Sequence, residues 1–229
     1  MIDAMFTSRD IAGIVIGFGF LFAVLAIATV LSRRTRLDAF VIRKLVHISV
    51  AHWWLIALHF HDSVPPALVG PVVFVILNYI DYRRTLYPGF TESRPDGGIG
   101  TVIFPVSLIV IVALTFGGLF PLAAGTAGIF VMGYGDGIAA LVGRRFGRRR
   151  LGQRTGKTVA GSAAMLVVSS FVLLAIFAVQ IGFRESGLTA LFILLIAAAA
   201  TGIEMFTPYD LDNLTVPIAV TVFAGLLLI

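Results

Sequence analysis

Residues 11–31 read IAGIVIGFGFLFAVLAIATVL, an uncharged and largely apolar run of 21 residues. A transmembrane helix needs about 20 such residues to cross the hydrocarbon core of a bilayer. The run is longer than the apolar region of a cleaved signal peptide, and it follows Asp3, Arg9 and Asp10 rather than a basic cluster. We therefore expect an uncleaved first membrane helix.

Further apolar runs of similar character follow along the chain. They cover residues 45–60, 64–80, 101–117, 121–143, 158–181, 187–205 and 214–229. The runs are too continuous for the alternating pattern of a membrane β-barrel. Several are short or interrupted by Pro and Gly, so we expect seven or eight spans. The sequence predicts an all-α, polytopic helical membrane protein with 7–8 transmembrane helices in one bundle, and a single integral membrane domain over residues 1–229.

Composition excludes several other classes of protein. With 59% hydrophobic and 13% charged residues, the chain cannot cover the surface of a soluble domain, and it is too apolar to be disordered. Because the chain contains no cysteine, disulfides and cysteine-ligated metals are excluded. The net charge of +5 is better explained by membrane topology than by nucleic acid, so no nucleic-acid partner is expected.

The basic residues predict the orientation of the chain in the membrane. Of the 17 Lys and Arg residues, 15 lie in the segments 32–44, 81–100 and 144–157, which are alternate loops. Cytoplasmic loops collect Lys and Arg, so we expect these loops in the cytoplasm and both termini outside. Most acidic residues outside the first helix fall on the same side, and we expect His52, His59 and His61 to be interfacial or outward-facing. Polar groups on one side of the membrane favour an enzyme that acts at the membrane surface, because a transporter more often places its polar residues at the middle of the membrane.

The basic group Arg43, Lys44 and His47 is the first candidate for chemistry. Its i, i+1, i+4 spacing allows all three side chains to lie on one helical face. Three potential cations together can clamp phosphate oxygens. The alternative is a positively charged membrane anchor with an interfacial histidine.

The second candidate is Asp136, which lies in an apolar run and is flanked by Gly133 and Gly135 before it and by Gly137 after it. An ionised carboxylate at the centre of a membrane costs roughly 2.5–3.5 kcal/mol, so it normally faces the protein interior with a partner or a metal. A carboxylate beside a basic, Gly-containing loop suits Mg²⁺ and a nucleotide polyphosphate. The alternative is a buried aspartate paired with an arginine for packing.

The sequence Gly156-Lys157-Thr158 is not a P-loop, because Leu151 stands where that motif requires glycine and no strand precedes it. A lysine and a hydroxyl at the start of the helix near residue 158 still favour anions.

Two further segments carry candidate groups. The stretch from Glu204 to Asn213 also contains Asp210 and Asp212, and these groups could bind a metal or a ribose. The alternative is that Asp212 or Asn213 only caps a helix. The stretch from Gly97 and Gly98 through Thr101 to Pro105 is either a loop over a nucleotide or only a turn.

Taken together, these motifs resemble a family of membrane enzymes. The segments RKLVH (43–47), GGIGTVIFPVSL (97–108), GDGIAALVGRRFG (135–147), GKTVAGS (156–162) and Glu204 with DLDNLTVP (210–217) are similar to the CTP-dependent lipid-alcohol kinases. That family includes dolichol kinase, phytol kinase and the CTP-dependent diacylglycerol kinase. The resemblance spans residues 43–217, and the 135–162 block also resembles the signature of phosphatidate cytidylyltransferases.

The resemblance implies transfer of the γ-phosphate of CTP to the hydroxyl of a membrane lipid alcohol, with Mg²⁺. The small size of the chain favours a prenyl alcohol such as phytol, geranylgeraniol, a polyprenol or dolichol. Asp136, Lys157 and Glu204 would be catalytic, and Asp136 and Asp212 would bind the metal. The implied nucleotide-binding residues are Arg43, Lys44, His47, Gly135, Gly137, Gly156, Thr158, Ser162 and Asn213.

The chain departs from the family pattern at two places. Ala160 stands where the family often has glutamate, and the usual double acid before Asn213 is Asp210-Leu211-Asp212. Glu204 or Asp212 would then supply the missing carboxylate. Transfer of CMP to a phospholipid and a non-enzymatic lipid transporter or binding protein are the alternatives. The sequence predicts no particular oligomeric state.

Overall fold

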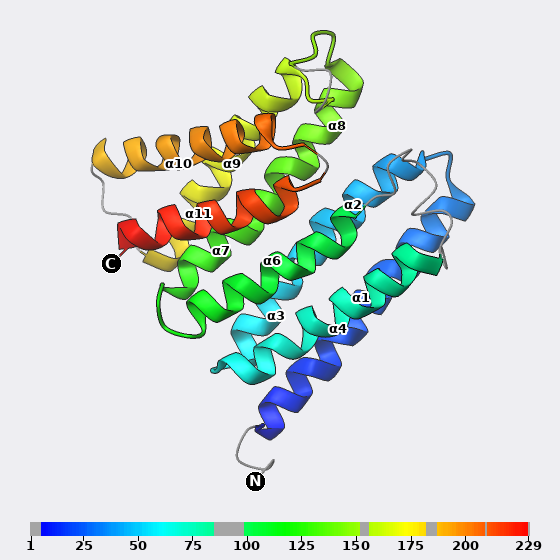
Figure 1. Ribbon diagram of the computed structural model, residues 1–229, viewed down its shortest axis with the longest axis vertical. Helices are drawn as coiled ribbons and strands as arrows, with labels where there is room; N and C mark the ends of the chain where they lie inside the picture. Colours follow the sequence, from blue (N-terminus) through cyan, green and yellow to red (C-terminus); the bar gives the residue numbers. More distant parts are fainter. Residues whose placement is uncertain (1–5, 85–98, 152–155, 182–186, 209, 229) are drawn as a thin grey trace. The chain divides into compact units, whose positions relative to one another are not determined.

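The computed structural model describes residues 6–84, 99–151, 156–181, 187–208 and 210–228. All regular elements in these residues are helices (Figure 1), apart from one isolated antiparallel bridge. This confirms the predicted all-α class. The helices form two compact units, residues 1–119 and residues 120–229. The single domain over residues 1–229 stays a prediction.

Among its described residues, the first unit contains five helices. They are α1 (Ser8–Arg34), α2 (Ala39–Ala51), α3 (Trp53–Phe60), α4 (Val64–Arg84) and α6 (Gly100–Thr115). Helix α1 packs against α2, α3 and α4, and α4 packs against α6. Gly17 allows α1 to approach α3 closely, because a Cβ atom at this position would lie only 2.8 Å from the indole Nε1 of Trp53. The indole therefore fills the space that the glycine leaves.

The second unit carries the motif-bearing part of the chain. Its helices are α7 (Leu122–Phe130), the π-helix η1 (Val131–Asp136), α8 (Gly137–Phe146), α9 (Val159–Ile176), the π-helix η2 (Phe177–Ile181), α10 (Gly187–Phe206) and α11 (Asp212–Leu228). Helix α9 packs against α8, η1 and α10, while α11 packs against α7 and α10. Helices α7, η1 and α8 follow one another without a break, so the apolar run 121–143 is one long rod.

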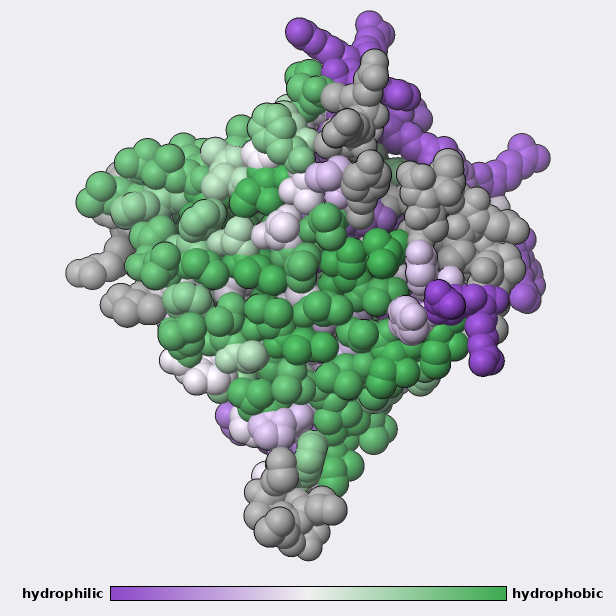
Figure 2. Space-filling model, viewed as in Figure 1, coloured by the Kyte–Doolittle hydropathy of each residue, from purple (hydrophilic) through white to green (hydrophobic). Residues whose placement is uncertain are grey.

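Most of the helical chain is long and apolar enough to cross a membrane. Among the described residues, six helical segments meet that criterion: Ser8–Arg34, Ala39–Phe60, Val64–Arg84, Leu122–Phe146, Val159–Gln180 and Leu188–Phe206. Two shorter apolar helices, Gly100–Thr115 and Asp212–Leu228, correspond to the remaining predicted runs. Figure 2 shows hydrophobic residues over most of the visible helix surfaces and hydrophilic residues gathered near helix ends. An exterior of this kind is expected for a protein surrounded by lipid tails.

The start of α1 is tied to the turn between α3 and α4 by a buried polar pair. His61 is 3% exposed, and its Nδ1 lies 2.9 Å from Oδ1 of Asp10. The other carboxylate oxygen of Asp10 accepts hydrogen bonds from the backbone and hydroxyl of Thr7, in a capping box. The expectation that His61 is outward-facing is therefore wrong, because a buried carboxylate requires polar partners. An interfacial position of His61 stays a prediction. His59 is exposed, as expected.

Candidate active site

Four charged residues of the second unit come from the ends of four different helical elements. Asp136 ends η1, Lys157 lies just before α9, Glu204 lies in the last turn of α10, and Asp212 begins α11. We call these four residues the Lys157 cluster. The resemblance to the lipid-alcohol kinases implies a catalytic or metal-binding role for all four, and the structure brings them together.

The Lys157 ammonium contacts all three carboxylates of the cluster. Its Nζ atom lies 2.5 Å from Oε1 of Glu204, 2.6 Å from Oδ2 of Asp212 and 3.5 Å from Oδ1 of Asp136. The three acidic residues are between 2% and 5% exposed, and the lysine side chain is 21% exposed. Such burial is costly for isolated charges, so each carboxylate depends on the ammonium for compensation.

The charge balance of the cluster favours a further cation. Burial of the Lys157 ammonium opposes its charge, but the carboxylates of Asp136, Asp212 and Glu204 outweigh burial and raise the pKa of Lys157 above its usual value. With the ammonium charged and the carboxylates ionised, the four groups carry a formal charge of about −2. A divalent cation would neutralise that excess.

The donor set also fits a hard divalent metal. One oxygen from each of Asp136, Glu204 and Asp212 lies within 4.8 Å of the others. Carboxylate oxygens are the ligands that Mg²⁺ prefers. The second oxygen of Glu204, Oε2, is buried and has no hydrogen-bond partner among the described residues. A buried acceptor without a donor is costly, and a bound cation or a substrate hydroxyl would satisfy it.

A π-helix positions Asp136. Residues 131–136, VMGYGD, form this element, and Asp136 is its last residue. Single π-helical turns within α-helices are frequent at functional sites. Gly135 faces α9, where an added Cβ would lie 2.7 Å from Oγ of Ser169 and 2.8 Å from Sδ of Met165. The glycine thus permits close packing of η1 on α9, while the roles of Gly135 and Gly137 in nucleotide binding stay predictions.

Backbone hydrogen bonds between the residues after α8 and the residues before α9 position Lys157. Leu151 donates its backbone N–H to the carbonyl of Lys157 at 2.9 Å, and Val159 donates to the carbonyl of Arg149 at 3.1 Å. Arg150 and Thr158 form the antiparallel bridge. Gly156 has a φ of +65°, a conformation that other residues adopt at a cost. Arg154 lies outside the described residues.

The hydroxyl residues predicted to contact phosphate have different surroundings. Thr158 is the N-cap of α9, and its Oγ1 accepts a hydrogen bond from the N–H of Gly161 at 3.1 Å. It also fills the space beside Gly143 and Gly147, where a Cβ would meet the threonine side chain. Ser162 is buried, and its Oγ has no partner among the described residues. Ser162 is therefore the better placed of the two to bind a ligand, and phosphate contacts for both stay predictions.

The turn before α11 orients Asp212. Asn213 donates its side-chain N–H to the carbonyl of Asp210 at 3.0 Å and its backbone N–H to Oδ1 of Asp212 at 3.0 Å. Asp210 adopts a positive φ of 62°. One oxygen of Asp212 thus accepts at the helix start while the other contacts Lys157, and metal or ribose contacts of this residue stay a prediction.

The basic group of α2 belongs to the first unit. His47 lies against Phe104 of α6, with ring centroids 5.0 Å apart, and the Arg43 guanidinium lies 6.0 Å from the ring of Phe40. Arg43, Lys44 and His47 are half-buried. Their part in a phosphate pocket stays a prediction.

The predicted glycine-rich loop is only partly described. Gly97 and Gly98 lie outside the described residues, while Gly100 and Thr101 begin α6 and Pro105 lies within it. The role of this segment over a nucleotide also stays a prediction.

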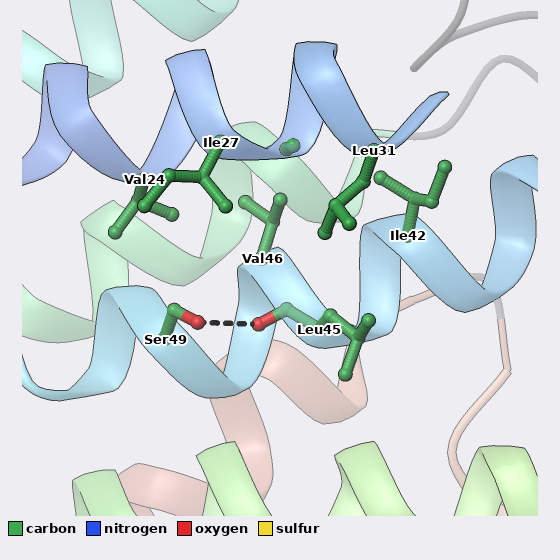
Figure 3. A pocket seen from close by; sticks show the side chains of 8 residues that line it. Val24, Ile27, Leu31, Ile42, Leu45, Val46 and Ser49 are labelled. Carbon is green, nitrogen blue, oxygen red and sulfur yellow. Dashed lines mark hydrogen bonds between the residues drawn. The ribbon is translucent and has the colours of Figure 1, made fainter. Parts of the chain in front are cut away.

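A small cavity lies between α1 and α2 of the first unit (Figure 3). Its volume is about 80 Å³, and its walls include Val24, Leu31, Ile42 and Val46. Ser49, at its edge, donates its hydroxyl to the carbonyl of Leu45 at 2.8 Å. An apolar cavity of this size offers nothing to a nucleotide.

Comparison with known proteins shows the family of the chain. The chain is 33% identical over 216 residues to the phytol kinase of Synechocystis sp., an alignment that covers 90% of this chain and 87% of the relative. The chain belongs to the phytol kinase family. As a member of the phytol kinase family it is a membrane kinase, which confirms the resemblance to the lipid-alcohol kinases.

Two plant members of the phytol kinase family are also similar. A probable phytol kinase 1, chloroplastic, of Glycine max is 26% identical over 209 residues, covering 82% of this chain and 67% of that protein. A probable phytol kinase, chloroplastic, of Triticum aestivum is 33% identical over 145 residues, covering 59% of this chain and 47% of that protein. No family model matches the chain, and no solved structure matches it.

Proposed function

We propose that this member of the phytol kinase family transfers the γ-phosphate of CTP to the hydroxyl of a prenyl alcohol such as phytol or geranylgeraniol. The observation that carries the proposal is the convergence of three buried carboxylates on the Lys157 ammonium. Phosphoryl transfer requires mainly positioning and neutralisation of charge, which acidic metal ligands and a fixed cation provide. The identity of the donor as CTP is supported by the resemblance of the sequence motifs.

In this proposal, Asp136 and Asp212 hold Mg²⁺, with Glu204 beside them. The metal, when bound, would neutralise charge on the phosphates of the nucleotide. Lys157 holds the phosphate chain, and the N-terminus of α9 behind it favours anions. The ammonium stays charged because its carboxylate neighbours raise its pKa.

Glu204 is the carboxylate that we assign to the acceptor hydroxyl. Its Oε1 contacts Lys157, while its Oε2 is buried without a partner among the described residues. Oε2 can therefore accept the hydroxyl proton as the alcohol oxygen bonds to the γ-phosphorus. The bond from that phosphorus to the bridging oxygen breaks in the same step, and CDP leaves. The products are the prenyl phosphate and CDP, with the proton on Glu204.

The site is proposed to face the cytoplasm, with both termini outside. Basic pairs in the last turns of α1, α4 and α8 support this orientation: Arg33 and Arg34, Arg83 and Arg84, Arg144 and Arg145. The first two pairs end helices that run from the predicted outer side, and the third ends the rod that contains Asp136. CTP would then reach the site from the cytosol.

The proposal is tested with purified protein in nanodiscs, supplied with Mg²⁺, prenyl alcohols, diacylglycerol and phosphatidate. CTP is labelled at the γ- or the α-phosphate, with γ-labelled ATP in parallel. We expect label to move from the γ-position of CTP into a prenyl alcohol. Label that moves only from the α-position would instead indicate transfer of CMP to a lipid phosphate. Transfer of label from ATP but not from CTP would overturn CTP as the phosphate donor.

The site assignment is tested in the same assay with an isosteric variant. Asp136→Asn removes one charge of the cluster and should abolish transfer. The matched control is Asp62→Asn, because the Asp62 side chain is 81% exposed and pairs with Arg9 at the surface. A surface pair of this kind contributes about 0–1 kcal/mol to stability, so the control should transfer phosphate as the wild type does.

A further inference from the structure

A groove lies between α10 and α11 of the second unit, with a volume of about 730 Å³. Binding sites for small molecules commonly measure about 300–1,000 Å³. Six apolar residues form most of its walls: Gly202, Ile203, Phe206, Leu214, Ile218 and Ala219. Thr207 and Thr215 complete the lining, so none of the lining residues is charged.

The groove adjoins the Lys157 cluster along both helices. Thr207 follows Glu204 by three positions, directly after the last residue of α10, and its N–H donates to the carbonyl of Ile203 at 3.0 Å. Thr215 follows Asp212 by three positions on α11. Residues at this spacing are neighbours on one helical face. The two threonine hydroxyls lie 3.4 Å apart and thus connect the helices beside the carboxylates. The only polar side chains of the groove therefore lie about one helical turn from the proposed reaction centre.

We propose that this groove binds the isoprenoid tail of the acceptor alcohol, with the hydroxyl end directed toward Glu204 and Asp212. This inference rests on the proposed function, because the kinase requires an apolar acceptor whose hydroxyl reaches the cluster. An uncharged, apolar lining suits an isoprenoid chain and not a nucleotide. Phe206 at the edge is 77% exposed, so the groove is open at the surface through which a lipid would enter.

Gly202 offers a direct test, because a Cβ at this position would meet no heavy atom within 4 Å. Gly202→Leu can therefore fill the groove without displacing a neighbour, and it replaces a poor helix former with a good one. We expect kcat/KM for a C20 alcohol to fall at least tenfold relative to that for a C10 alcohol. An unchanged ratio between the two alcohols would overturn the groove assignment.

The matched control is Gly19→Leu. Gly19 is also a helical glycine with nothing within 4 Å of a Cβ, but it lies on α1 of the first unit. This variant adds the same side chain at an exposed membrane helix and should leave the ratio between C20 and C10 alcohols unchanged. A similar change in both variants would overturn the assignment, because the effect would then not be specific to the groove.

A binding measurement separates failure of this inference from failure of the proposed function. The probe is a geranylgeraniol analogue with a photoreactive diazirine on its terminal isoprene unit. We expect cross-links within residues 202–219 that unlabelled geranylgeraniol competes away and that Gly202→Leu reduces. If the cross-links that unlabelled geranylgeraniol competes away were confined to other helices, the assignment of the groove as the tail-binding site would be overturned. If the wild type phosphorylates no alcohol, the proposed function fails, and the cross-links still decide whether the groove binds a prenyl chain.

Discussion

Lys157 and Asp212 are 55 positions apart in the chain, yet the ammonium of one lies 2.6 Å from the carboxylate of the other. The contact joins the start of α9 to the start of α11. Because Glu204 and Asp136 contact the same ammonium, Lys157 is the shared partner of three acidic residues from separate elements. It is therefore both a candidate catalytic residue and a link between helices.

Replacement of Lys157 should affect stability as well as activity. Lys157→Met keeps an unbranched side chain but leaves three buried carboxylates without their common cation. Removal of one partner from a buried ion pair typically costs about 3–5 kcal/mol. We expect the free energy of unfolding in detergent to fall by about 3 kcal/mol and phosphate transfer to be lost.

The control for Lys157→Met is Arg148→Ala, which removes a positive charge from an exposed position in the same loop. Thermal unfolding of both variants provides the comparison. Equal stability of Lys157→Met and Arg148→Ala would contradict the shared role of the ammonium.

Removal of divalent metal should stop the reaction. We expect EDTA to abolish phosphate transfer and Mg²⁺ to restore it, because the donor set of the cluster is three carboxylates. Asp212→Asn should raise the Mg²⁺ concentration for half-maximal rate at least tenfold, whereas Asp62→Asn should not change it. A rate that persists in EDTA would refute a divalent metal, and an unchanged Mg²⁺ requirement in Asp212→Asn would remove Asp212 from the proposed ligands.

Gly135 should be coupled to Ser169 across the interface of η1 and α9. A Cβ at Gly135 would lie 2.7 Å from Oγ of Ser169, so Gly135→Ala should destabilise the protein by about 1–3 kcal/mol and reduce the rate by displacing Asp136. Ser169→Ala removes that oxygen, which has no partner among the described residues, and should cost little alone. In the double variant we expect a coupling free energy of at least 0.5 kcal/mol. Strict additivity of the two single effects would disprove the contact.

The sequence predicts the helices well because membrane spans depend on local composition. Each predicted apolar run contains a described helix, since about 20 apolar residues suffice to specify one. Asp136 could also be predicted, because an ionisable group within a membrane segment is costly unless it has a partner or a function. The roles of Lys157, Glu204 and Asp212 are implied by the resemblance to the lipid-alcohol kinases.

Other features depend on contacts that no local pattern reveals. The pairing of His61 with Asp10 joins residues 51 positions apart, so His61 looks outward-facing in the sequence although it is buried. The π-helix before Gly137 differs from an α-helix in that each hydrogen bond spans one residue more. The same apolar sequence can form either helix, so the sequence does not reveal which one is present. The position of Lys157 depends on backbone hydrogen bonds between short, irregular segments, residues 149–151 and 157–159.

The orientation of the chain can be measured with single cysteines, because the protein has none of its own. Thr35 follows the basic end of α1, and Ser63 lies in the turn between α3 and α4; both are exposed. We expect Thr35→Cys to react with an impermeant maleimide only from the cytoplasmic side and Ser63→Cys only from the outer side. The opposite pattern would place the basic loops outside.

The backbone conformation of Gly156 should matter more for activity than for stability. Its φ of +65° lies in the left-handed region, and a Cβ there would meet nothing within 4 Å. Gly156→Ala should therefore cost only the conformational strain of about 1–2 kcal/mol. Since Lys157 is the next residue, relief of that strain would move the ammonium, and we expect kcat to fall by at least tenfold.

Gly118 provides the matched control for this effect. It has a φ of +80° and open space around a Cβ, but it lies in the turn after α6 of the first unit. Gly118→Ala should lower thermal stability about as much as Gly156→Ala and leave kcat unchanged. Gly156→Asn should recover part of the lost rate, because asparagine tolerates positive φ better than alanine. Equal losses of kcat in Gly118→Ala and Gly156→Ala would mean that strain acts through general destabilisation and not through the position of Lys157.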